Sequence, residues 1–115
     1  MFLAEVCFET NNVIQLADFY RKLLHIEEEN QDEVHQLITG GQVAITVYND
    51  GSVKNNQNTN ITLAFTVEDV DIEYERLKEM GITIVEPPTT RPWGARNMHF
   101  CDPDGNHVYF RSFPK

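Results

Sequence analysis

Residues 92–106 are the most informative part of the sequence for the fold, and they read Pro92-Trp93-Gly94-Ala95-Arg96-Asn97-Met98-His99-Phe100-Cys101-Asp102-Pro103-Asp104-Gly105-Asn106. The stretch predicts a strand, a tight turn and the start of a second strand. Pro103 favours the turn, Gly105 can take a positive φ, and the Asp and Asn side chains around them hydrogen-bond the local backbone. The chain is therefore expected to end in a β-hairpin.

The segment that precedes this hairpin has the pattern of a strand followed by a helix. Apolar residues alternate with polar ones from Ile61 to Val67, which predicts a strand with one buried face. Asp69 is placed to cap a helix over Val70–Met80, and Gly81 follows it where a left-handed residue is favoured. Three further strands are predicted around Thr83–Val85, Arg96–Cys101 and His107–Ser112.

The same order of elements is predicted in the first half of the chain. Phe2–Glu9 alternates like a strand, Asn11-Asn12 supplies a helix N-cap, and Val13–Leu24 has apolar residues at helical spacing. Short strands are expected within Ile26–Glu29, Glu33–Thr39 and Gln42–Tyr48. The chain is thus predicted to hold two strand-helix-strand-strand-strand units in tandem. The side chains expected under the helices are Val6, Phe8, Leu63, Phe65, Val108 and Phe110.

A length of 115 residues suits one domain. We expect unit one over about residues 1–49, a polar linker over about 50–60 and unit two over about 61–115.

The charge and the apolar pattern exclude several classes of partner. Lys and Arg number 9 against 18 Asp and Glu, which gives a formal net charge of −9 and argues against nucleic-acid and membrane-surface binding. No apolar run approaches the roughly 20 residues that span a bilayer, and the N-terminus does not resemble a signal peptide. Cys7 and Cys101 are far apart with no motif spacing, so we expect reduced thiols in a cytoplasmic protein.

Three motifs, in order, resemble the vicinal-oxygen-chelate superfamily, which contains glyoxalases, bleomycin-resistance proteins and dioxygenases. They are Asp18-Phe19-Tyr20-Arg21-Lys22-Leu23-Leu24, Val67-Glu68-Asp69-Val70-Asp71 and the hairpin at 92–106. The resemblance implies an α+β fold in which two βαβββ units form an open, cup-shaped mixed β-barrel with helices outside. Because members of this superfamily commonly pair their units between chains, it also implies a homodimer.

The resemblance also implies where a divalent metal would bind, and the residues there do not suit one. The four positions fall on Glu5, Thr46 (or Ile45 with a shift of one residue), Thr62 and Tyr109. One carboxylate with hydroxyl side chains is a poor ligand set for a dication. We therefore expect no metal and no cofactor, unless Glu9 and His99 complete an irregular site beside Glu5.

The hairpin brings a second group of reactive residues together. With a five-residue loop, Cys101 faces His107 and His99 faces Tyr109, all on the side away from Val108. A thiol with two imidazoles can bind a soft metal or form a nucleophile and base. No motif for either chemistry is present, so we favour a structural role in lining the cup.

The remaining candidates each allow two interpretations. Trp93 is either an aromatic lid over a ligand or an anchor for its turn. Arg96 either holds an anion or, as we favour, makes a buried structural ion pair. Glu5 and Glu9 either recognise a cation, with Glu5 also a possible base, or lie on an exposed strand face. His25 and His35 are expected on the surface. The residues predicted to bind a ligand are Glu5, Cys7, Thr62, Trp93, His99 and Tyr109.

Three functions remain after these considerations. The first is a metal-free protein, similar to bleomycin-resistance proteins, that binds a small molecule in the cup, and the acidic charge makes a cation a candidate ligand. The second is a lyase, isomerase or dioxygenase, with a metal or with Glu5 as base and Tyr109 as acid. The third is a structural or regulatory module without a pocket. We favour the first because the metal ligands are missing and the chain is acidic.

Overall fold

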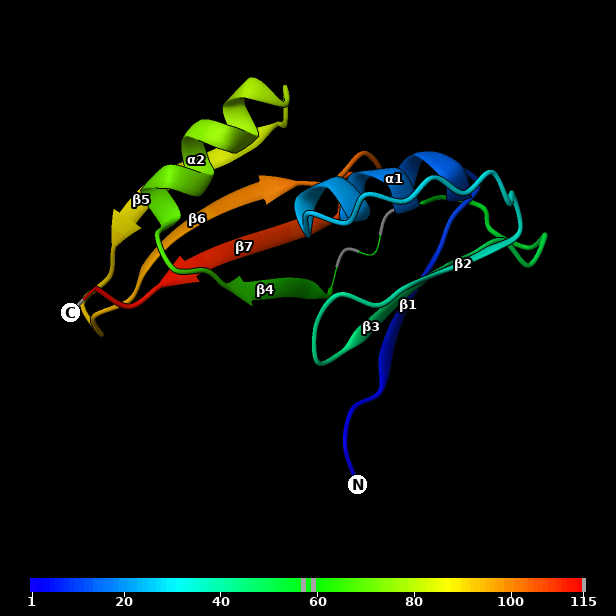
Figure 1. The fold of residues 1–115 in the computed structure, drawn as a ribbon, viewed down its shortest axis with the longest axis horizontal. Helices are drawn as coiled ribbons and strands as arrows, with labels where there is room; N and C mark the ends of the chain where they lie inside the picture. Colours follow the sequence, from blue (N-terminus) through cyan, green and yellow to red (C-terminus); the bar gives the residue numbers. More distant parts are fainter. Residues whose placement is uncertain (57, 59, 115) are drawn as a thin grey trace. The chain divides into compact units, whose positions relative to one another are not determined.

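The computed structural model describes residues 1–56, 58 and 60–114 and has the predicted α+β composition (Figure 1). The chain divides into two compact units, Met1–Asn56 and Gln57–Lys115, which we call unit one and unit two. Unit one contains β1 (Glu5–Glu9), α1 (Val13–Leu23), β2 (His35–Ile38) and β3 (Ala44–Tyr48). Unit two contains β4 (Thr62–Thr66), α2 (Val70–Glu79), β5 (Ile84–Thr90), β6 (Arg96–Cys101) and β7 (His107–Ser112). No helix in the described ranges is long and apolar enough to cross a membrane.

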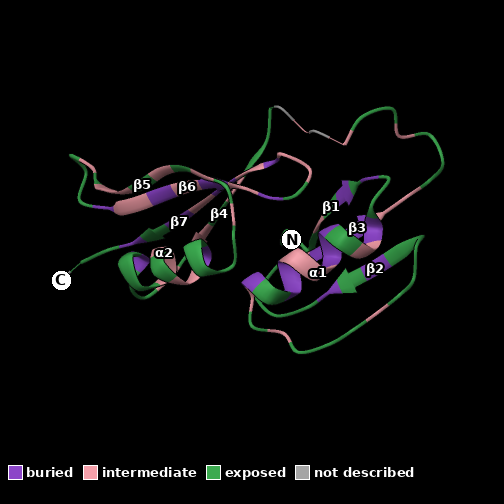
Figure 2. Cartoon of the chain, turned by 90° about the horizontal axis from the view of Figure 1, so that it is seen from above, coloured by how far each residue is buried: buried purple, intermediate pink, exposed green. Residues whose placement is uncertain are grey.

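Unit one is a three-stranded sheet with α1 packed on one face. The strand order is β1-β3-β2, with β1 parallel to β3 and β2 antiparallel to it. Phe8 of β1 stacks on Tyr20 of α1 with ring centroids 5.4 Å apart, and both side chains are buried. Ile45 and Val47 of β3 are also buried, so the core lies between the sheet and α1 (Figure 2).

Two predictions for unit one were wrong at its less regular segments. The strand expected within Ile26–Glu29 does not form, so this unit is strand-helix-strand-strand. The Ile26 N–H instead donates to the Arg21 carbonyl at 2.8 Å and so closes the end of α1. The Gln36 side chain donates hydrogen bonds to the carbonyls of Asn30 and Asp32, both at 2.9 Å, and these bonds hold the part of the loop just before β2. β1 begins only at Glu5, so the first residues of the predicted Phe2–Glu9 strand lie outside it, and Phe2 is 83% exposed.

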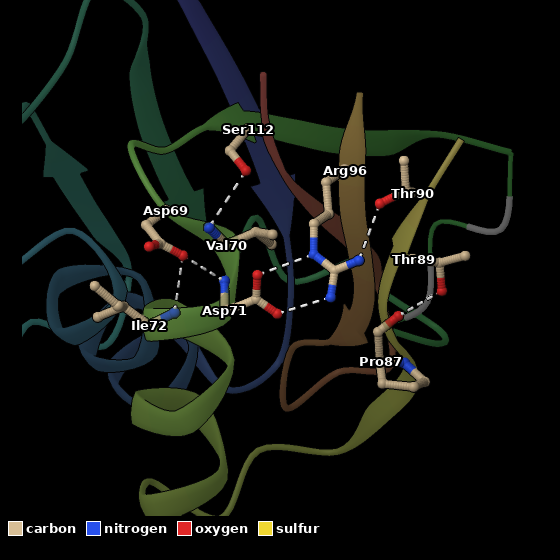
Figure 3. A network of polar contacts seen from close by, with 9 residues as sticks. All are labelled: Asp69, Val70, Asp71, Ile72, Pro87, Thr89, Thr90, Arg96 and Ser112. Carbon is tan, nitrogen blue, oxygen red and sulfur yellow. Dashed lines mark hydrogen bonds and ion pairs between the residues drawn. The ribbon is translucent and has the colours of Figure 1, made fainter. Parts of the chain in front are cut away.

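The two helix starts differ in how they are capped. The Asp69 carboxylate accepts hydrogen bonds from the backbone N–H groups of Asp71 at 2.9 Å and Ile72 at 3.3 Å, which confirms the predicted cap (Figure 3). Asn12 occupies the N-cap position of α1, as predicted, but its side chain makes no cap hydrogen bond. Gly81 follows α2 with φ +75°, as predicted for a left-handed helix end.

Unit two is a four-stranded sheet in the order β4-β7-β6-β5, with β4 parallel to β7 and the other pairs antiparallel. α2 covers one face and contacts β5, β6 and β7. Phe100, Val108 and Phe110 are buried on that face, and Phe110 meets the edges of both Phe65 and Phe100. Of the predicted core, Phe8, Val108 and Phe110 are buried, whereas Val6, Leu63 and Phe65 are only half-buried.

The predicted hairpin forms with the predicted register. Cys101 pairs with His107 and His99 with Tyr109 across β6 and β7. The buried Asp102 carboxylate accepts hydrogen bonds from the Asp104 and Asn106 backbone N–H groups and from the Asn106 side-chain amide, at 2.9–3.0 Å. Gly105 takes φ +83°. The loop is thus held by its own side chains.

β5 is longer than the predicted Thr83–Val85. It runs to Thr90 through Pro87 and Pro88, with register shifts against β6 on either side of Glu86. Proline is tolerated here because β5 is the outermost strand of its sheet and needs few backbone donors.

Candidate functional site

The face of the unit-two sheet that carries no helix gathers three of the six predicted ligand-binding residues, Thr62, His99 and Tyr109. Strand pairing places Asn97, His99 and Cys101 of β6 beside Arg111, Tyr109 and His107 of β7, on the side opposite the buried apolar residues. Parallel pairing with β4 then sets Thr62 next to His107 and Ala64 next to Tyr109. We call this surface the helix-free face of unit two.

Four side chains of this face, His99, Cys101, His107 and Tyr109, form a cluster that we call the His–Tyr cluster. The rings of His99 and Tyr109 stack with centroids 4.4 Å apart and an interplanar angle of 9°. His99 Nε2 lies 2.7 Å from His107 Nδ1, so one of these nitrogens donates a hydrogen bond to the other. The Cys101 thiol lies 3.8 Å from the same His107 nitrogen. All four side chains are half-buried, which leaves part of each accessible to a ligand.

Two members of this cluster, His99 and Cys101, have shifted pKa values that favour their neutral forms. Burial and the neighbouring His107 lower the pKa of His99, and the negative charge of Glu86 opposes this only in part. Burial and the charge of Asp102 raise the pKa of the Cys101 thiol. A neutral imidazole and a protonated thiol can bind and orient a ligand, but this thiol is not activated as a nucleophile. The geometry therefore favours the lining role over the nucleophilic one.

A polar network beside the cluster was missed by the sequence analysis. Glu86 of β5 pairs in register with His99 and makes an ion pair with Arg91. The Arg91 Nε donates to Asn97 Oδ1 at 2.8 Å. These residues were overlooked because β5 was expected to end before Glu86. The only sequence signal for a longer β5 was the Pro87-Pro88 pair after Glu86, because proline within a strand is tolerated at the edge of a sheet.

Trp93 is not on a strand of the helix-free face but in the turn between β5 and β6. Backbone bonds between Arg91, Gly94 and Ala95 close this turn at 2.8–3.0 Å. Trp93 is 72% exposed, so its side chain does not anchor the turn by packing. Its exposure is compatible with the other interpretation, in which the ring covers a bound ligand.

Arg96 makes the structural ion pair that we favoured, but the pair is not buried. Its Nε and Nη2 each donate to an Asp71 carboxylate oxygen at 2.9 Å, and Nη1 donates to Thr90 Oγ1 at 3.0 Å (Figure 3). The side chains of Arg96 and Asp71 are 31% and 55% exposed. The guanidinium ties β6 to the start of α2 and is not offered to an anionic ligand.

The other predicted site residues, Glu5 and Cys7, lie on β1 in unit one. Glu5 Oε2 accepts a hydrogen bond from Thr46 Oγ1 at 2.8 Å. Loss of hydration, followed by the charges of Glu5 and Glu9, raises the pKa of the Cys7 thiol. His35 on β2 is exposed, as predicted, and meets the edge of Tyr48 with ring centroids 6.0 Å apart. His25 is also exposed, and its φ of 58° ends α1.

Comparison with known proteins agrees with this fold. The sequence profile of the Glyoxalase/Bleomycin resistance protein/Dioxygenase superfamily matches residues 3–110. The chain belongs to this superfamily. One solved structure, described as a conserved domain protein, matches with a TM-score of 0.83 and 25% sequence identity. The match covers 99% of this chain and 100% of the other chain. A glyoxalase/bleomycin resistance protein/dioxygenase from Nocardioides has a TM-score of 0.79 at 20% identity, covering 100% of this chain and 85% of that one.

A curated relative matches only part of the chain. The uncharacterized protein YraH of Bacillus subtilis (strain 168) is 41% identical over 58 residues. The match spans 50% of this chain and 45% of that protein.

The residues that the resemblance places at the superfamily metal positions are a poor donor set for a divalent ion. Three of the four residues, Thr46, Thr62 and Tyr109, offer only hydroxyl groups, and Thr46 already donates its hydroxyl to the single carboxylate, Glu5. Within the described residues, no three His, Cys, Asp or Glu side chains form a metal-binding group. The donor chemistry is therefore too weak to replace the hydration shell of a small dication.

Proposed function

We propose that this superfamily member binds a small molecule on the helix-free face of unit two, without a metal. The observation that carries the proposal is the His99–Tyr109 stack. It presents two half-buried rings beside the small side chain of Ala64 on β4. A methyl group at this place leaves room next to the Tyr109 ring, and a planar ligand can extend the stack there.

The charge of the chain supports a cationic or electron-poor ligand. A net charge of −9 attracts cations at long range, and a neutral His99 places no positive charge against them. An aromatic ring such as Tyr109 also stabilises a cation over its face.

We further propose that Trp93 folds over the bound molecule, and that Thr62 contacts it from β4. The two free cysteines support a cytoplasmic location.

Isothermal titration calorimetry with a defined panel tests this function. The panel contains bleomycin, because resistance to it is one of the functions after which the superfamily is named, and aromatic ammonium compounds, each with its neutral isostere. We expect saturable binding of at least one cationic aromatic compound and weaker binding of its neutral isostere. Tyr109→Ala and Trp93→Ala should each weaken binding by about 1–3 kcal/mol.

Two further variants make the test specific to the proposed position. Ala64→Leu should block binding while it leaves Tyr109 intact, because the larger side chain fills the space beside the ring. Ile72→Ala changes an exposed apolar residue of α2 and is the matched control, with no expected effect. The proposal is wrong if no compound binds, or if binding is indifferent to both Tyr109→Ala and Ala64→Leu.

A further inference from the structure

Unit one contains a buried arginine whose charge is incompletely partnered. Arg21 lies on α1, and its side chain is 3% exposed. Its Nη1 donates a hydrogen bond to Gln36 Oε1, and the Gln36 amide donates to the carbonyls of Asn30 and Asp32. One end of the guanidinium is thus held firmly by β2 and the loop that precedes it.

The other edge of the same guanidinium is not satisfied. Nε and Nη2 are both buried and have no hydrogen-bond partner among the described residues. The closest carboxylate is that of Glu28, whose Oε2 lies 4.0 Å from Nε, and the Glu28 side chain is 59% exposed. A guanidinium is always charged, so burying two of its donors without partners is costly.

Arg96 shows which group the Nε–Nη2 edge of an arginine binds elsewhere in this chain. In Arg96 the same two atoms, Nε and Nη2, hold the two oxygens of the Asp71 carboxylate, each at 2.9 Å (Figure 3). The unfilled edge of Arg21 therefore matches one carboxylate in a bidentate arrangement.

A cavity of about 780 Å³ lies beside this arginine, between α1 and the loop before β2, and both Arg21 and Glu28 line it. This volume is in the range of small-ligand sites. The side-chain amides of Asn12, Gln15 and Gln31 also line it, and within the described part of the chain they make no hydrogen bond. These amides can both donate to and accept from a ligand.

The remaining charges of the cavity favour a ligand that also carries a positive group. Lys22 pairs with Asp18 at 3.0 Å, so those two charges largely cancel. Glu29 and Glu33 line the cavity as well, and both are exposed. A simple anion would be repelled by them, whereas a zwitterion would place one charge on Arg21 and the other on these carboxylates.

We propose that this cavity is a second ligand site, which binds a short peptide. Its terminal carboxylate occupies the Nε–Nη2 edge of Arg21 and displaces the exposed Glu28 side chain. Its peptide groups meet the Asn and Gln amides, and its terminal ammonium group lies against Glu29 and Glu33. This site lies on the helix side of unit one and does not depend on the function proposed for unit two.

Titration of trialanine into ¹⁵N-labelled protein tests the proposal. Trialanine with free termini should shift the Arg21 Nε–H resonance and saturate at millimolar concentration. Its C-terminal amide and its N-acetyl derivative, which each lack one charge, should bind about tenfold more weakly or less well still. No saturation by trialanine, or equal affinity for trialanine and its C-terminal amide, overturns the proposal.

Variants at the cavity distinguish a ligand site from an internal Arg21–Glu28 ion pair. Glu28→Gln removes the competing carboxylate and should tighten peptide binding, whereas Glu29→Gln with Glu33→Gln should weaken it. Glu27→Gln is the matched control, because Glu27 is exposed in the same acidic run but does not line the cavity. Arg21→Met should abolish binding, with circular dichroism to verify folding. If Glu28→Gln instead lowers the melting temperature and leaves peptide binding no tighter, Glu28 is the partner of Arg21 and the proposal is wrong.

Discussion

At the scale of single residues, His99 links the candidate site to stability. It stacks on Tyr109, hydrogen-bonds His107 and lies in register with Glu86. Its pKa is lowered by burial first and by His107 second, because a positive charge on His99 would be poorly hydrated and close to a second imidazole. The same features that favour neutral His99 thus make the folded state sensitive to acid.

The sign of this sensitivity follows from the lowered pKa. Above the ordinary histidine pKa of about 6.5, His99 is neutral in the folded and unfolded chain, so it does not affect stability. As the pH falls through this value the unfolded chain takes up the proton first, and the folded state loses stability until the folded pKa is passed. We expect the melting temperature to fall between pH 7.5 and pH 5.5, and the fall to be smaller in His99→Gln. His35→Gln, at an exposed position, should behave like the original chain. An unchanged pH dependence in His99→Gln would contradict this prediction.

The metal prediction also belongs to single residues. Glu5 is the only carboxylate among the four superfamily positions, and its hydrogen bond with Thr46 occupies one of its oxygens. We expect Ni²⁺, Mn²⁺, Zn²⁺ and Fe²⁺ to leave the melting temperature unchanged, and Glu5→Gln to leave the metal content unchanged. Metal analysis after purification without chelator measures the second quantity. A stoichiometric metal that disappears in Glu5→Gln would instead support an enzyme of the superfamily.

At the scale of elements, the start of α2 is held by two different kinds of contact. Asp69 caps the helix through two backbone N–H groups, while Asp71 pairs with Arg96 of β6 (Figure 3). The cap satisfies donors that the helix cannot satisfy itself, whereas the exposed ion pair is weakened by water and salt.

The cap should therefore contribute more to stability than the ion pair. We expect Asp69→Ala to destabilise the chain by about 1 kcal/mol. Asp71→Ala should cost less, and its effect should shrink more than that of Asp69→Ala in 1 M salt, where the Debye length falls to about 3 Å. Urea denaturation at low and high salt measures both. A larger loss in Asp71→Ala than in Asp69→Ala would reverse this ranking.

At the scale of the whole molecule, both sheets end in outermost strands. These are β1 and β2 in unit one and β4 and β5 in unit two. Such strands present backbone groups that proteins usually cover. Phe2 and Leu3, just before β1, are 83% and 67% exposed and can pack against a second copy.

We accordingly expect a homodimer, as the resemblance to the superfamily also implies. Light scattering at tens of micromolar protein should give twice the mass of 13.3 kDa. Phe2→Ser with Leu3→Ser should shift the equilibrium toward the monomer if these side chains contribute to the contact. Val85→Ser, at an exposed position of β5, tests the other sheet in the same way. A monomer mass for the original chain at this concentration would refute the expectation.

The sequence by itself determined the elements whose signals are local. The bounds of β6 and β7 and their register were predicted as they are found, because Asp102, Gly105 and Asn106 build the turn from their own side chains. The same holds for the cap at Asp69. Within the candidate site, the pairing of His99 with Tyr109 and of Cys101 with His107 followed from that register alone.

Only the tertiary structure decided the features that depend on distant partners. The burial of Arg21 and the extension of β5 past Glu86 both result from contacts with residues remote in sequence or on a neighbouring strand. The distance between the His99 and His107 rings and the unfilled edge of Arg21 likewise depend on how side chains pack. Local hydrogen bonds define a turn before the chain folds, but burial and charge pairing exist only after it has folded.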